Sequence, residues 1–157
     1  MSHGVRIVEA DTDWALAVRG RLLVTVWRTL ATAARVGRVD AAIRAIVETG
    51  REPGYASITV VEPTISLLLD EEARRASTTL QTRWAERMKC SAYLVDGTGF
   101  LMATVRTVTS GMALVTRAPY PTKVFADVGS TVAWVSPFAG LGAPEVGGAI
   151  AAARAAR

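Results

Sequence analysis

Apolar and polar positions alternate along the first part of the chain, with the period of two that is typical of β-strands. Three runs rich in Val, Leu and Ala, separated by short turn candidates, cover residues 5–10, 14–20 and 21–27. They predict three consecutive strands in an antiparallel meander. The alternation of Trp14, Leu16 and Val18 places three apolar side chains on one face of the sheet.

The period changes after this meander. Between Thr32 and Thr49, apolar residues recur at three and four positions, and arginines and acids occupy most of the rest. This spacing predicts an amphipathic helix over 32–49. Gly50 stands where a helix commonly ends with a residue in the left-handed conformation. The apolar stripe consists of Val36, Val39, Ile43 and Ile46.

The middle of the chain continues with strand, helix and strand. Residues 55–63 are β-branched and mostly apolar, which indicates a central strand that ends at a proline. A helix then starts at Asp70, because acids are favoured at a helix N-terminus. Residues 90–97 predict another buried strand, in which Cys90 is a small apolar filler. The stripe of the helix is formed by Leu69, Ala73, Ala76, Leu80, Trp84 and Met88.

Residues 100–115 carry two competing patterns. Their β-branched alternation favours a strand, whereas the spacing of their apolar residues matches a helical seam. We predict a helix, because strands and helices alternate before this segment. The seam consists of Leu101, Val105, Val108, Met112 and Val115.

The C-terminal part predicts a strand at 122–126 and a short helix at 130–135. Residues 137–157 are rich in Gly and Ala and contain few large apolar side chains. This composition predicts a mobile tail after an ordered domain of residues 1–136. Strands that alternate with helices after a meander indicate an α/β fold, a mixed sheet of about six strands with about four helices.

Charge and composition narrow the function classes. The net charge is +4, but the arginines are interleaved with acids and form no block, so we do not expect nucleic-acid binding. A single cysteine excludes an intrachain disulfide. No signal-peptide pattern and no apolar run of about 20 residues occurs, so we expect a soluble cytoplasmic protein without a transmembrane segment.

The candidate chemistry is sparse. The only histidine is His3, near a terminus, which leaves histidine-based catalysis and a zinc site without ligands. The loop Asp96–Phe100 resembles a phosphate cradle, but Met102 stands where a third glycine belongs and no Walker lysine follows. We therefore expect no enzyme activity, no cofactor and no metal, and we interpret Gly97 and Gly99 as a tight strand-to-helix turn.

A longer pattern resembles a known family. The runs "ITVVEP", "DEEARRA", "AYLVDGTGFLMATVRTVTSGMALV" and "PYPTKVFADVGSTVAWV" resemble STAS-like domains, the relatives of anti-sigma-factor antagonists, in a mostly uncharacterised bacterial group. The resemblance covers residues 5–136. The matching positions are Gly97, Gly99, Phe100, Arg106, Gly111, Pro121, Val124, Phe125 and Trp134.

The resemblance implies a small α/β domain that acts by contacting other proteins. In that family a partner kinase phosphorylates a Ser or Thr that follows a central strand, and this switches binding. The matching hydroxyls here are Thr64 and Ser66, which are also candidates for turn or capping roles. This segment has Glu62-Pro63 and no glycine, whereas the family has an Asp-Ser-x-Gly type of motif. A phosphate there would lie near Arg74 and Arg75.

Two function hypotheses remain. The first is a non-enzymatic regulatory or scaffold domain that binds another protein or a second copy as a homodimer, with Arg74, Arg75, Gly97, Gly99 and Arg106 at the interface. Arg106 is equally a surface arginine or a structural partner of an acid such as Asp96. The alternative is a domain that binds a small molecule or lipid between helices and sheet, lined by helix 100–115 and the tail.

Overall fold

The computed structural model describes residues 4–62, 70–95, 99, 103–107 and 118–157. Six strands form one sheet in which the spatial order follows the chain order. The strands β1 to β3 pair antiparallel, and β3 to β6 pair parallel, which confirms the predicted meander and mixed sheet. The strands are β1 (Arg6–Ala10), β2 (Trp14–Arg19), β3 (Leu22–Trp27), β4 (Tyr55–Val61), β5 (Met88–Val95) and β6 (Thr122–Phe125).

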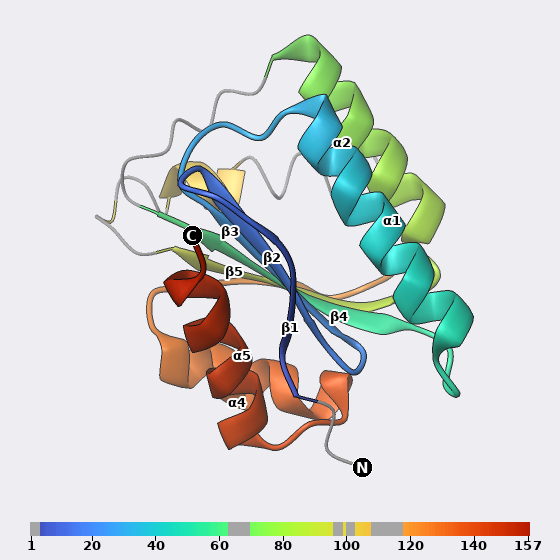
Figure 1. The fold of residues 1–157 in the computed structure, drawn as a ribbon, viewed down its shortest axis with the longest axis vertical. Coiled ribbons are helices and arrows are strands. Elements are labelled where there is room, and N and C mark those ends of the chain that lie inside the picture. The colour runs from blue at the N-terminus through green and yellow to red at the C-terminus, as the bar shows by residue number, and fades with distance from the viewer. Residues whose placement is uncertain (1–3, 63–69, 96–98, 100–102, 108–117) are drawn as a thin grey trace.

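Helices cover both faces of the sheet (Figure 1). On one face lie α1 (Ala33–Thr49) and α2 (Glu71–Trp84), and on the other lie α4 (Val128–Ala139) and α5 (Ala143–Ala155). Residues 103–107 are also helical, within the segment predicted as helix 100–115. None of the helices in the described ranges has the length and apolar content needed to cross a bilayer.

The period of two in β2 sorts its side chains between two cores. Trp14, Leu16 and Val18 pack in the core beneath α1, as their alternation predicted. Ala15 and Ala17 point to the other face, into the core beneath α4 and α5. A strand buried on both faces shows little polar alternation, and all five of these residues are buried.

Two predicted boundaries are corrected by backbone contacts. Gly50 ends α1 in an extended conformation, with φ at −73°, rather than in the left-handed one. A Cβ there would lie 2.8 Å from the Ile46 carbonyl oxygen, so close approach explains the glycine. Met88, predicted in the helical stripe of α2, instead begins β5, because it pairs with Tyr55 of β4.

The predicted helix 130–135 is longer in the structure. α4 begins at Val128, because the Oδ1 atom of Asp127 accepts a hydrogen bond of 2.7 Å from the Ser130 amide. It ends at Gly140, which has a left-handed φ of 65°. The segment after Gly140 then turns into α5, in which Glu145 accepts a hydrogen bond from the Gly142 amide.

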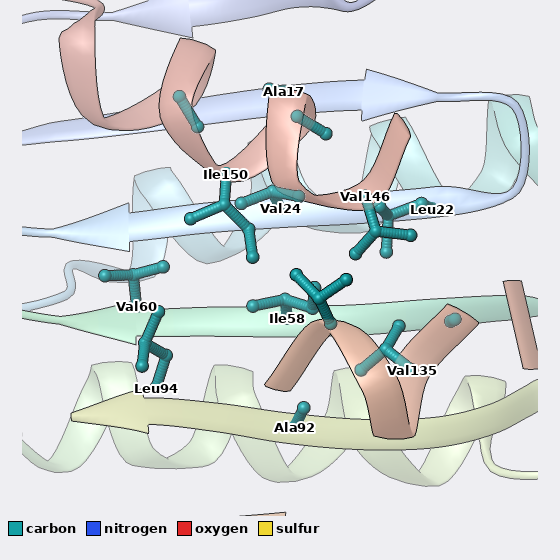
Figure 2. Close-up of a cluster of buried hydrophobic side chains, with 14 of the residues drawn as sticks. Ala17, Leu22, Val24, Ile58, Val60, Ala92, Leu94, Val135, Val146 and Ile150 are labelled. Atoms are coloured by element: carbon teal, nitrogen blue, oxygen red, sulfur yellow. The ribbon is translucent and has the colours of Figure 1, made fainter. Parts of the chain in front are cut away.

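The prediction of a mobile Gly- and Ala-rich tail is wrong for the described residues. Most of the segment 137–157 is helical, and α5 buries one face against β2 and β3. Figure 2 shows Val146 of α5 beside Leu22 of β3, and Ile150 of α5 beside Val24 of β3, within one cluster. The buried residues of α5 are Val146, Ala149, Ile150 and Ala153, each at most 1% exposed.

Arg28, just after β3, fixes the C-terminal end of α5. Its Nη2 atom donates to the carbonyl oxygens of Arg154 at 2.9 Å and Ala156 at 3.0 Å. Its Nη1 atom donates to the Asp11 carbonyl oxygen at 3.0 Å. The last carbonyls of a helix have no intrahelical partner, so this guanidinium supplies the missing donors.

Candidate functional site

The carboxyl ends of β4 and β5 define the first candidate site. The two strands are parallel neighbours, and Val61 pairs with Val95 at their ends. Val105, 3% exposed, packs against both valines. The helical stretch 103–107 therefore lies over these strand ends. Figure 1 shows it, in yellow, at the same end of the sheet as the first turns of α1 and α2.

The described site residues of the segment after β5 are exposed. Arg106 follows the buried Val105 and is exposed. Gly99 is helical and exposed, and a Cβ added to it would meet no atom of the described residues within 4 Å. Gly97 and Phe100 lie outside the described residues.

Of the predicted site residues between the end of β4 and the first turns of α2, the structure describes only some. Arg74 and Arg75 lie in the first turns of α2 and are exposed, and Arg75 forms an ion pair with Glu71. Thr64 and Ser66 lie outside the described residues. The cap of α2 is Asp70, whose Oδ1 atom accepts a hydrogen bond of 2.7 Å from the Ala73 amide.

α2 is held to α1 by a polar contact that the sequence pattern did not reveal. The Oδ1 atom of Asp40 in α1 accepts hydrogen bonds from Trp84 Nε1 and Arg83 Nη1 of α2, both at 2.8 Å. Asp40 stands 43 and 44 positions from these partners. No local spacing rule connects residues so far apart. In the sequence, the apolar stripe of α1 indicated only that the helix face next to Asp40 packs against another element.

A second candidate site lies on the sheet face toward α1 and α2. Before the apolar strand ends at Val61 and Val95, the alternate residues that face this side are polar or aromatic over residues 55–59 of β4 and residues 91–93 of β5. Their neighbours fill the opposite core. Ser57 and Ser91 are paired across the two strands and are both buried. We name as the hydroxyl cluster Tyr55, Ser57, Ser91, Tyr93 and Tyr120.

Burial raises the pKa of all three tyrosines of the hydroxyl cluster. Burial raises the pKa of Tyr55 far above its usual value, with smaller effects from Tyr120 and Asp40. Burial also raises the pKa of Tyr93, and it raises that of Tyr120 to about 12, where Tyr93 adds to the shift. All three therefore stay neutral at physiological pH and act only as hydrogen-bonding groups.

Tyr55 stands out within the hydroxyl cluster. It has no exposed surface, and its hydroxyl has no hydrogen-bond partner among the described residues. An unsatisfied buried hydroxyl costs about 1–3 kcal/mol. In the sequence, Tyr55, Ser57 and Thr59 alternate with the apolar Ala56 and Ile58. This alternation could have predicted a polar face on β4.

Catalytic and metal chemistry find little support in the described residues. Cys90 is buried in the core beneath α4 and α5, as predicted, and burial raises the pKa of its thiol to about 12. A thiol with this pKa is not a nucleophile at neutral pH. Within the described ranges, no three His, Cys, Asp or Glu side chains lie close enough together to hold a metal ion.

The architecture defines the fold. The mixed six-stranded sheet, with an N-terminal meander followed by parallel strands and with helices on both faces, is similar to a solved structure that is described as having a SpoIIAA-like fold, the fold of STAS domains. The resemblance inferred from the sequence is thus confirmed for the fold.

The fold assignment rests on similarity to a solved structure. It is an uncharacterized protein of the DUF3478 family with a SpoIIAA-like fold from Shewanella loihica PV-4. The similarity has a TM-score of 0.51 and 15% sequence identity, and it covers 84% of this chain and 94% of that chain. No protein-family model and no curated protein sequence matches the chain.

Proposed function

We propose that this chain is a non-enzymatic regulatory or scaffold domain that binds another protein through the carboxyl-end surface. This surface is defined by the exposed residues Arg74, Arg75, Gly99 and Arg106, and we include Gly97 in it. The packing of Val105 on Val61 and Val95 carries the proposal. It anchors the helical stretch 103–107 over the strand ends, where Arg106 is exposed.

The charge of this surface indicates the kind of partner. Three of its residues are arginines, which bind carboxylates with a planar fork of donors. The Arg75–Glu71 pair is exposed on both sides, and exposed pairs contribute little to stability. Arg75 can therefore exchange Glu71 for an acidic group of a partner at low cost. We infer a partner with an acidic binding surface.

Phosphorylation of Thr64 or Ser66 is the regulatory step that we propose for this surface. A phosphate carries nearly two negative charges at neutral pH. Placed in the connection before α2, it would attract Arg74 and Arg75 and compete with an acidic partner. Intact-mass measurement of protein from its native cells should show an added phosphate in some growth conditions. Its absence in all of them would remove this step and leave the binding proposal standing.

Substitution of Arg106 tests the binding proposal. We expect Arg106→Glu to weaken capture of the protein partner at least tenfold, because a negative charge would repel the acidic surface. Affinity capture from the source cells, quantified by mass spectrometry, measures the change. Arg51→Glu is the matched control, since Arg51 is exposed beyond the end of α1. Equal capture by wild type, Arg106→Glu and Arg51→Glu would refute the proposal.

A small molecule bound at the hydroxyl cluster is the second candidate function. The specific observation in its favour is the buried Tyr55 hydroxyl, which lacks a hydrogen-bond partner in the part of the chain that the structure describes. A polar group of a ligand would satisfy this hydroxyl and remove its cost. Such a ligand would be neutral and would present hydrogen-bonding atoms, since the surrounding tyrosines are uncharged at physiological pH.

Tyr55→Phe discriminates between an empty and an occupied cluster. In protein refolded from denaturant, we expect the substitution to raise the free energy of unfolding by about 1 kcal/mol, because it deletes an unsatisfied polar atom. Urea titration of both proteins measures this. The second candidate function also requires a bound small molecule. Native mass spectra of natively purified wild-type protein should show this molecule, and those of Tyr55→Phe should lack it. Spectra without any bound molecule would eliminate it.

A further inference from the structure

The N-terminal strand β1 is an exposed edge of the sheet. Among the strands of the described residues, β1 pairs only with β2. Ile7 is 40% exposed and Val8 is 38% exposed, and Leu30 is the other large apolar residue with comparable exposure among the described residues. An exposed apolar edge strand presents unpaired backbone groups and is a template for pairing with another strand.

A β-bulge gives this edge an unusual charge pattern. The register between β1 and β2 shifts between Ile7 and Glu9. Arg6 is opposite Val18, and Glu9 is opposite Leu16. Val18 and Leu16 both point toward α1, so Arg6 and Glu9 lie on that same face. In a regular strand, residues three positions apart point to opposite faces, so the bulge creates this arrangement.

The segment Arg6-Ile7-Val8-Glu9 is therefore self-complementary in an antiparallel pair. A two-fold axis perpendicular to the sheet keeps the α1 face of both copies on the same side. Arg6 of each copy then stands opposite Glu9 of the other. Ile7 and Val8 meet Val8 and Ile7 of the other copy at the axis. Directly opposite residues of unlike charge stabilise an antiparallel pair, and apolar pairs do so as well.

We propose that a second copy of this chain adds its β1 antiparallel to β1, joining the two sheets into one continuous sheet. The ion pair that Glu9 forms within its own chain is weak enough to allow this contact. Arg38 Nε lies 3.7 Å from Glu9 Oε2, and the Arg38 side chain is 69% exposed. Such an exposed pair is weak, so Glu9 retains its capacity to bind Arg6 of the second copy.

Charge reversal tests this pairing on the full-length chain. Sedimentation velocity and light scattering over a concentration series should show a wild-type dimer. Arg6→Glu places glutamates opposite each other at two sites of the dimer, and Glu9→Arg does the same with arginines. We expect each to raise the dimer dissociation constant at least tenfold, about 1.4 kcal/mol. The double reversal Arg6→Glu with Glu9→Arg restores opposite charges and should return it to within about threefold.

Controls keep the outcome decisive. Arg51→Glu changes the net charge by the same amount as Arg6→Glu at an exposed site outside β1 and should leave dimerisation unchanged. Thermal melts of every variant verify folding. Arg6 is exposed, and the pair of Glu9 with Arg38 is the one ion pair of Glu9 among the described residues, so we expect each variant to fold. A wild-type monomer at all concentrations would overturn the proposal and show that the bulge protects the edge. A dimer that ignores single reversals, or a double reversal that stays monomeric, would overturn it equally.

Discussion

A chain that ends at Gly140 is expected to lose cooperative folding. The truncation removes α5 and with it the buried side chains of Val146 and Ile150. Burial of one Val or Ile contributes about 1.5–3 kcal/mol, and the truncation also exposes Leu22 and Val24 of β3, which α5 covers. The combined loss exceeds about 5 kcal/mol, which is comparable to the whole stability of a typical domain.

Circular dichroism and urea unfolding of the truncated chain measure this effect. Ile150→Ala in the full-length chain should show a graded version, a loss of about 2–5 kcal/mol. Ala151→Ser is the matched control, because Ala151 lies in the same helix but is exposed, and it should cost less than about 0.5 kcal/mol. A truncated chain that unfolds at the same urea concentration as wild type would show that the segment is dispensable.

Arg28→Ala is expected to have the next largest effect among single substitutions outside the core. The guanidinium donates to carbonyl oxygens of Asp11, Arg154 and Ala156. Hydrogen bonds to a charged group contribute about 1.5–3 kcal/mol each. Water can hydrate part of the released carbonyls, so we expect a net loss of about 3 kcal/mol in the free energy of unfolding.

The fork geometry of Arg28 gives a sharper test than the alanine variant alone. Arg28→Lys keeps the positive charge but places a single ammonium group where three separate carbonyls accept, so it should recover less than half of the loss. Hydrogen exchange of the amides in α5 should accelerate in both variants. Arg51→Ala, at an exposed position, is the control. Full stability of Arg28→Ala would show that packing alone holds α5.

The candidate site could be predicted from the sequence only in part. The connection after β5 and the exposed Arg106 followed from the strand-to-helix pattern and from the family resemblance. Arg74 and Arg75 were correctly expected on the surface of α2. The contact of Asp40 with Trp84 and the unsatisfied Tyr55 hydroxyl were not predicted, because each depends on which helix covers which part of the sheet. The structure shows where Arg74, Arg75, Gly99 and Arg106 lie, but their functional roles stay predictions, as do those of Thr64, Ser66 and Gly97.

The error about the C-terminal segment has a physical cause. Its Gly and Ala content gives little contrast between faces, so composition suggested a tail. Yet Val146, Ala149, Ile150 and Ala153 recur at the spacing of one helix face. Small side chains let a helix approach a sheet closely, and close packing then compensates for the small area that each residue buries.

The amino-acid sequence by itself determined the six strands, the helices α1 and α2, part of α4, and the apolar stripe that α1 buries. Local periodicity carries this information, because side chains project at a period of two from a strand and of 3.6 from a helix. Only the tertiary structure decided that α5 closes one face of the sheet, that Arg28 caps it, and that a bulge in β1 turns Arg6 and Glu9 to one side. These features depend on contacts between residues far apart in the chain, which no local period encodes.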